Sequence, residues 1–262
     1  AQARRAEALD FDGISVAELA HDAFLLAALA AEHTERVAVA TSIAVAFPRS
    51  PMTVAYASWD IQRLSEGRFQ LGLGTQVKGH IQRRFSTKWV SPGPRMREYA
   101  LALKAIWRSW QEGMPLDYQG KHYRFSLMPP EFNPGRIPHP SIPVYAAAVG
   151  PGMCRIAGEA FDGVLLHSFC TALYTHWVVL PALEAGAGRS GRSIKDVGVS
   201  GGGFIATGAT EGEVEQQREE ARRRIAFYAS TRTYKGVLDQ HGWGDVCLRL
   251  HELSLKGRWE VM

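Results

Sequence analysis

The sequence has little cysteine and no long apolar segment. Its three cysteines, Cys154, Cys170 and Cys247, are too few and too widely spaced for a disulfide framework or a CxxC metal or redox pair. The longest apolar run, Phe24 to Ala31, is far shorter than the roughly 20 residues of a membrane-spanning helix, and no signal-peptide pattern opens the chain. We therefore expect a cytoplasmic protein with no membrane partner.

Several catalytic signatures are also missing. There is no HExxH motif, no GxGxxG that opens a helix after a strand, no Walker-type GxxxxGK loop and no Gly-x-Ser-x-Gly elbow. His251-Glu252 lacks the second histidine of a metalloprotease motif. We therefore expect neither a metal site nor nucleotide hydrolysis.

Charge of neither sign dominates the chain. It holds 30 Lys and Arg against 26 Asp and Glu, a formal net charge of +4, and the basic residues are spread along its length. Arg222 to Arg224 stand beside Glu219 and Glu220, as on a solvated helix face. A nucleic-acid partner is therefore not expected.

The composition suits a globular protein of the α/β class. Hydrophobic residues make up 46% and charged residues 21% of 262 residues, enough for one domain over 1–262. Apolar, partly β-branched runs predict strands at 13–17, 37–43, 69–73, 144–148, 163–167 and 197–207. A β-hairpin and a Pro-rich loop at about 114–142 interrupt this order.

Segments of helical periodicity separate the predicted strands. Tyr99, Leu103, Ile106 and Trp110 are spaced as the buried stripe of one helix, and Val214, Arg218, Ala221, Ile225 and Tyr228 suggest another. Alternating strands and helices demand a parallel sheet with right-handed crossovers. Periodicity alone leaves both a doubly wound open sheet and a closed barrel possible.

Three segments in a fixed order resemble the luciferase-like monooxygenase superfamily: Thr41 to Phe47, Ser50 to Leu64, and Gly67 to Thr75. Ala147 to Pro151 and Ala160 to Val164 extend the similarity over nearly the whole chain. The resemblance implies a (β/α)8 TIM barrel with its active site at the carboxyl ends of the strands. Only six of eight strands are recognisable, so we expect a barrel that lacks its first and last strands in this chain.

The chain is similar, within that superfamily, to the oxidoreductases that use the deazaflavin coenzyme F420. This similarity implies hydride transfer between F420 and a small organic substrate, with the coenzyme carrying the chemistry. An FMN-dependent monooxygenase that uses molecular oxygen is the alternative. A non-catalytic flavin-binding or partner subunit is a second alternative.

The resemblance also indicates site residues. His21 follows the first predicted strand, where the family commonly keeps a histidine, and an imidazole can donate or accept a proton near neutral pH. A surface loop histidine that caps Asp22 or the following helix is the competing interpretation. The family implies a non-proline cis peptide bond beneath the coenzyme ring, which we place at Ser42-Ile43, after Thr41.

Further coenzyme contacts are expected at three more strand ends. Gly74, Thr75 and Gln76 follow one predicted strand, and His167 and Ser168 follow another. Val149, Gly150 and Pro151 precede a helix whose free N–H groups favour a phosphate-bearing tail. The basic loop residues His80, Arg83 and Arg84 could gather an anionic coenzyme tail or substrate, but a solvated basic loop explains them better.

A homodimer is expected from the family resemblance. The helix at 52–64 carries Val54, Tyr56, Trp59 and Ile61 around more than one face. This distribution suggests burial on two sides, one against the barrel and one against a partner.

Overall fold

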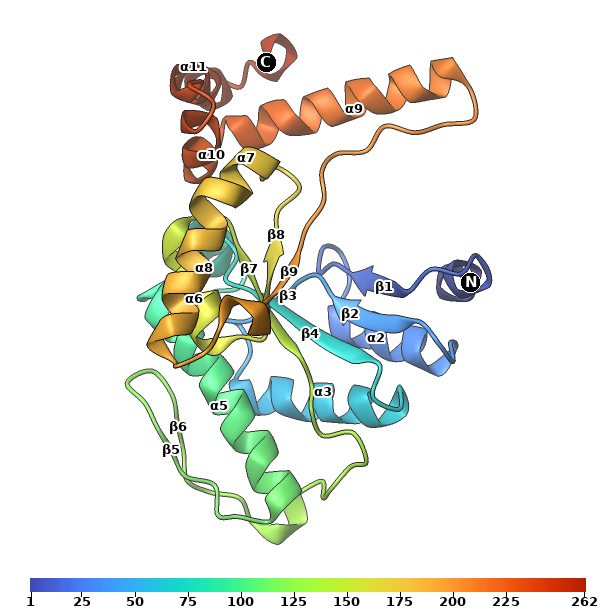
Figure 1. The fold of residues 1–262 in the computed structure, drawn as a ribbon, viewed down its shortest axis with the longest axis vertical. Coiled ribbons are helices and arrows are strands. Elements are labelled where there is room, and N and C mark those ends of the chain that lie inside the picture. Colours follow the sequence, from blue (N-terminus) through green and yellow to red (C-terminus); the bar gives the residue numbers. More distant parts are fainter.

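A computed structural model describes all 262 residues and has a parallel β-sheet at its centre (Figure 1). Six strands lie side by side, each parallel to its neighbours, and they occur in the sheet in the order of the chain. They are β1 (Gly13–Val16), β2 (Ala38–Thr41), β4 (Phe69–Gly74), β7 (Val144–Ala148), β8 (Gly163–Leu166) and β9 (Gly198–Ser200). The short strand β3 (Ala44–Val45) pairs with β4 beyond the end of β2. The prediction of an α/β fold with six parallel strands is confirmed.

Helices connect the strands and pack against them: α2 against β1 and β2, α3 against β4, and α6 against β7 and β8. Their bounds are α1 (Gln2–Ala8), α2 (Ala23–Glu32), α3 (Pro51–Leu64), α4 (Lys78–Arg83), α5 (Pro92–Glu112), α6 (Pro151–Ala160), α7 (Ala172–Tyr174), α8 (Leu180–Arg189), α9 (Glu211–Ala229), α10 (Lys235–Asp239) and α11 (Gly244–Leu255). A π-helical stretch, Thr175–Val179, joins α7 to α8. Short 3-10 turns lie at Pro130–Phe132, Ile194–Asp196, Arg232–Tyr234 and Trp259–Val261.

Local sequence signals explain where the main helices begin and end. Ser50 caps α3 through the Met52 amide, Pro51 occupies the first turn, and Gly67, with φ of +90°, stands in the turn that follows the helix. The stripe expected on α5 is buried as predicted, because Tyr99, Leu103 and Ile106 are fully inaccessible and Trp110 nearly so. The apolar side chains of the sheet and its helices form one core cluster.

The predicted hairpin is present between α5 and β7, where Tyr118–Gln119 pairs antiparallel with Arg124–Phe125. The strand expected at 197–207 is wrong beyond its first residues. Only Gly198–Ser200 pairs with β8, and the chain then runs through Gly201, Gly202 and Gly203, which supply no side chains for a packed strand.

The helix predicted from Val214 to Tyr228 is present as residues 211–229 of α9. Its amphipathic pattern does not give a buried face, because Arg218 and Ile225 are exposed and Val214 is only half-buried. Figure 1 shows why: a long loop carries α9 away from the strands, towards α10 and α11. No helix of the chain has both the length and the apolar character needed to cross a membrane.

Candidate active site

The residues expected to bind a ligand gather at one edge of the sheet. Because all strands are parallel, their carboxyl ends meet there. His21 follows β1, Ser42 and Ile43 follow β2, Thr75 and Gln76 follow β4, Val149 to Pro151 follow β7, and His167 and Ser168 follow β8. The structure therefore places the expected residues on five successive strand ends.

A close approach between β2 and β4 shapes the centre of this edge. The Thr41 hydroxyl donates to the Gly72 carbonyl at 2.8 Å and accepts from the Gly72 amide at 2.9 Å. A Cβ atom on Gly72 would lie 2.0 Å from the Thr41 carbonyl oxygen, so only glycine fits there. Thr41 therefore acts as a side-chain bridge between the two strands.

The peptide bond between Ser42 and Ile43 is cis, as the family resemblance implies. The Ser42 amide donates to the Val16 carbonyl at 2.7 Å, and the Ile43 carbonyl accepts from the Glu18 amide at 3.2 Å. The Ile43 side chain lies against Gly74, where a Cβ would meet it at 2.7 Å. The backbone on both sides of this bond is thus held by the end of β1.

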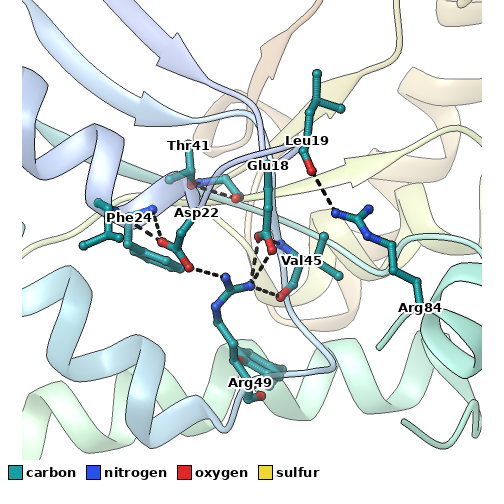
Figure 2. A network of polar contacts seen from close by, with 11 residues as sticks. Glu18, Leu19, Asp22, Phe24, Thr41, Val45, Arg49 and Arg84 are labelled. Carbon is teal, nitrogen blue, oxygen red and sulfur yellow. Dashed lines mark hydrogen bonds and ion pairs between the residues drawn. The ribbon is translucent and has the colours of Figure 1, made fainter. Parts of the chain in front are cut away.

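An ion-pair network lies beside these strand ends (Figure 2). The buried Glu18 carboxylate accepts from the Val45 amide at 2.8 Å and from Arg49 Nη1 at 2.8 and 3.0 Å. Arg49 also donates to the Val45 carbonyl at 3.0 Å and pairs with Asp22 at 2.6 Å. Both peptide groups of Val45 are consequently fixed by one carboxylate and one guanidinium.

The pairing of Asp22 with Arg49 favours the ionised form of both side chains. Burial acts to raise the pKa of Asp22, but hydrogen bonds from Arg49 and from the Leu25 and Phe24 amides outweigh it, so this pKa lies below its usual value. Burial acts to lower the pKa of Arg49, and the two carboxylates overcome this effect. Arg49 therefore stays charged and has its partners within the protein.

His21 does not join this network. Its side chain is exposed, and the structure shows no hydrogen bond from it. Asp22 instead caps α2, by accepting from the amides of Phe24 at 2.8 Å and Leu25 at 3.2 Å. The loop that holds His21 is fixed at Leu19, whose carbonyl accepts from Arg84 at 2.8 Å. Of the three weaker basic candidates, only Arg84 therefore touches the strand ends through a hydrogen bond; His80 and Arg83 are exposed.

The turn after β4 is closed by its own side chains. Gln76 has a φ of +57°, and its side-chain oxygen accepts from the Val77 amide at 3.2 Å. The Thr75 hydroxyl donates to the Gln76 carbonyl at 3.0 Å. These two side chains hold the turn in shape, directly after the buried Gly74.

The start of α6 is open. Gly150 occupies the N-cap position without a side-chain cap, and Pro151 is the first helical residue. A Cβ on Gly150 or Gly152 would meet no atom within 4 Å. The Val149 carbonyl is already bound by the Tyr174 hydroxyl at 3.1 Å. Pro151 has no N–H group, and the Met153 and Cys154 amides donate to the Gly150 carbonyl at 3.1 Å, which leaves the Gly152 amide without a backbone partner in this turn. The open space beside Gly152 could accommodate an anionic group.

His167 lies in an aromatic cluster at the end of β8. Its ring centroid is 4.2 Å from that of Tyr228 and 5.1 Å from that of Tyr234. Burial lowers the pKa of His167. Its Nδ1 atom accepts from the Phe169 amide at 3.0 Å, so the neutral ring carries its proton on Nε2. Ser168 is half-buried beside this cluster.

Sequence reasoning missed Glu18 and Arg49. They are 31 residues apart in the chain, and no motif links them. A glutamate directly after a predicted strand was the one available signal. It also missed Tyr228 and Tyr234, whose rings pack against His167. Tyr228 lies near the end of α9, and Tyr234 lies in the 3-10 turn that follows this helix.

The apolar residues of α3 are largely accounted for within one chain. Val54, Trp59 and Ile61 are buried. The Trp59 indole donates to the Gly135 carbonyl at 3.0 Å, and the Tyr56 hydroxyl donates to the Phe132 carbonyl. The loop before β7 therefore covers the face that suggested a partner, and the homodimer stays a prediction.

Comparison with known proteins places the chain among related sequences. An uncharacterized protein of Mycobacterium tuberculosis (strain H37Rv) is 48% identical over 252 residues, which cover 96% of this chain and 74% of the relative. An F420-dependent glucose-6-phosphate dehydrogenase of Nocardia farcinica is 31% identical over 68% of this chain and 52% of the relative. This chain spans about half the length of that dehydrogenase.

Solved structures share the fold. The coenzyme F420-dependent tetrahydromethanopterin reductase from Methanopyrus kandleri superposes with a TM-score of 0.76 at 22% identity, covering 98% of this chain and 75% of the reductase. A riboflavin lyase solved with modified FMN and riboflavin gives a TM-score of 0.70 at 14% identity, covering 87% of this chain and 60% of the lyase. The sequence profile of the luciferase-like monooxygenases matches residues 1–262. The chain therefore belongs to the luciferase-like monooxygenase family.

Proposed function

We propose that the protein is an oxidoreductase in which bound coenzyme F420 supplies or accepts the hydride exchanged with a small organic substrate. The observation that carries this proposal is the sequence similarity to an F420-dependent dehydrogenase, 31% identical over 68% of the chain. The fold shared with an F420-dependent reductase at a TM-score of 0.76 supports the same architecture. Glucose 6-phosphate, the substrate in the name of that relative, is not part of the proposed reaction.

The strand ends fit such a coenzyme. The half-buried Ile43 side chain, next to the cis peptide bond, suits the flat ring. Gly72 and Gly74 are buried and make room for the Thr41 backbone and for the Ile43 side chain. The open N-terminus of α6 at Gly150 and Gly152 suits the phosphate-bearing tail, because the unpaired Gly152 amide and the helix dipole favour an anion.

The remaining expected residues take roles around this core of the site. Thr41 and Ser42 hold the backbone beneath the ring, and Thr75 and Gln76 shape the adjoining turn. His167 and Ser168 contact the coenzyme or substrate from β8. His21, exposed at the rim, handles the proton that balances the hydride.

Anaerobic turnover tests the proposed reaction. The purified protein is mixed with reduced F420 and a panel of aldehydes, ketones and enones, and with oxidised F420 and the matching alcohols. We expect stoichiometric oxidation or reduction of F420 with at least one substrate class and none without protein. Absence of turnover across the panel, in protein that also fails to bind F420, would overturn the proposal.

An FMN-dependent monooxygenase is the second candidate. The family's name and the solved neighbour with modified FMN favour it. Oxygen consumption with reduced FMN and substrate, in protein that binds FMN more tightly than F420, would support this candidate over the first. Binding of neither coenzyme would leave the non-catalytic partner subunit as the better description.

A further inference from the structure

A cavity of about 780 Å³ lies over the carboxyl ends of β8 and β9. This volume falls within the range of roughly 300–1,000 Å³ that is typical of small-molecule sites. Leu166 and Val199 line it from the two strands, and Gly201 to Gly203 line it after β9. Leu238 of α10 and Trp243, which precedes α11, close the opposite side.

The lining of this cavity contains no Asp, Glu, Lys or Arg side chain. Its imidazole groups belong to His176 and His241. Burial raises the pKa of the Cys170 thiol to about 11, so this wall residue is neutral at neutral pH. A charged group that enters such a cavity loses its hydration without gaining an ionic partner, which is costly.

The cavity nevertheless offers polar groups for one oriented contact. The Thr171 hydroxyl and His241 Nε2 lie 2.8 Å apart in its wall. The His241 ring is stacked on Trp243, with centroids 4.8 Å apart, which fixes its orientation. Ser168 lines the cavity next to His167, at the strand edge where the coenzyme is expected. The cavity thus adjoins the expected coenzyme site and has hydrogen-bonding groups in its wall.

We propose that this cavity binds the organic substrate and that the part of the substrate it encloses is uncharged and largely apolar, with a hydroxyl or carbonyl group. The description of this ligand as a substrate rests on the proposed function. A sugar phosphate does not suit this cavity, because neither lysine nor arginine lines it. A neutral aliphatic or aromatic alcohol, aldehyde or ketone does.

Two glycines in the wall allow a test by filling the cavity. A Cβ on Gly202 or Gly203 would meet no atom within 4 Å, and neither residue has a positive φ. Gly203→Leu should therefore occupy ligand space without a clash in the protein. Gly188→Leu on α8 is the matched control, because its Cβ also meets no atom within 4 Å and the residue is exposed outside the cavity.

Fluorescence titration with Nile red, an uncharged apolar probe, measures binding to the wild type and both variants. We expect Gly203→Leu to weaken binding by about tenfold or more, a loss of at least 1.4 kcal/mol, and Gly188→Leu to leave it unchanged. Decan-1-ol should displace the probe at about tenfold lower concentration than decanoate, and glucose 6-phosphate should not displace it. Equal displacement by the charged competitors, or equal affinity in both variants, would overturn the proposal.

An F420 titration of the same three proteins separates this proposal from the proposed function. If the wild type and Gly203→Leu bind F420 equally while only the wild type binds Nile red tightly, both proposals stand. If F420 binds but Gly203→Leu has no effect on Nile red, the cavity proposal alone fails. If no coenzyme binds but Nile red binding depends on Gly203, the proposed function fails. The cavity then still binds an apolar ligand, but this ligand is not the substrate of an F420-dependent reaction.

Discussion

Glu18 and Arg49 bind the two peptide groups of Val45, the second residue of β3. Glu18 accepts from the Val45 amide, and Arg49 donates to the Val45 carbonyl. The side chains are 7% and 19% exposed, so the pair is largely shielded from water. Removing one charge of such a pair leaves the other without its compensation, which costs more than the loss of an exposed ion pair. The ordered backbone around Ser42 and Ile43 should therefore depend on this pair.

Glu18→Gln should lower the free energy of unfolding by about 2–3 kcal/mol, since it removes a charged acceptor from a buried guanidinium. Urea denaturation measures this change. Asp60→Asn is the control, because the Asp60–Arg63 pair is more than 60% exposed on both sides. Its replacement should change the free energy by less than about 0.5 kcal/mol. Similar losses in the two variants would contradict the role given to Glu18.

Asp22 makes a pH-dependent contribution to the free energy of unfolding. Its lowered pKa means that its share of the stability is complete above the unfolded-state value of about 3.9 and is lost as the pH falls through the lower folded-state value. Asp22→Asn keeps a capping oxygen for α2 but removes the charge that pairs with Arg49. The stability difference between wild type and variant should thus be largest near neutral pH and shrink in acid. Urea midpoints from about pH 6 to about pH 3 measure it, and a constant difference would contradict this assignment.

Helices α6 and α8 approach each other at two glycines. A Cβ on Gly158 would lie 2.1 Å from the Leu183 carbonyl oxygen, and one on Gly186 would lie 1.9 Å from the Arg155 carbonyl oxygen. Both obstacles are backbone atoms, which move only if a helix moves. The position of α6, and with it the open N-terminus at Gly150, therefore depends on these contacts.

Gly186→Ala should destabilise the protein by about 1–3 kcal/mol, because the added methyl group forces the two helices apart. Gly188→Ala on the same helix meets no atom within 4 Å and should stabilise it by about 0.5–1 kcal/mol, as expected when alanine replaces glycine in a helix. Thermal unfolding of the two variants compares them directly. A stabilising Gly186→Ala would contradict the close packing described.

Elements with a strong internal pattern were predictable from the sequence. The stripe of Tyr99, Leu103 and Ile106 fixed the buried face of α5, and the apolar run Val144–Ala148 became β7 without change. The end of β9 was not predictable, because pairing with β8 rather than the run of residues 197–207 sets its length. Helix α9 has a capping box at Thr210 and Glu213, which locates its start, but its periodicity did not reveal that it leaves the sheet.

The candidate site followed the same division. Its location at the strand ends could be predicted, since the position of each loop follows from the parallel order. The contacts within it could not: Asp22 rather than His21 caps α2, and Glu18 meets Arg49 only after folding. Pairings between distant residues are made by tertiary packing and carry no signal in one sequence.

At the scale of the whole molecule, six parallel strands bring the loops at their carboxyl ends to one edge of the sheet. In a luciferase-like monooxygenase, this edge is the expected place of the active site. This edge has three distinct parts: the apolar side chain of Ile43, the open start of α6 at Gly150, and the cavity beside Ser168, which no Asp, Glu, Lys or Arg lines. Each suits one part of a reaction between a phosphate-bearing coenzyme and an uncharged substrate. We therefore propose that F420 binds at this edge.

Equilibrium fluorescence titration with F420 and with FMN, on the wild type and on Gly152→Leu, tests that claim most directly. We expect the wild type to bind F420 at least about tenfold more tightly than FMN. Gly152→Leu should weaken F420 binding by a similar factor, because its side chain enters the space at the start of α6, while Gly188→Leu should not. Tighter binding of FMN, or F420 binding that Gly152→Leu leaves unchanged, would contradict it.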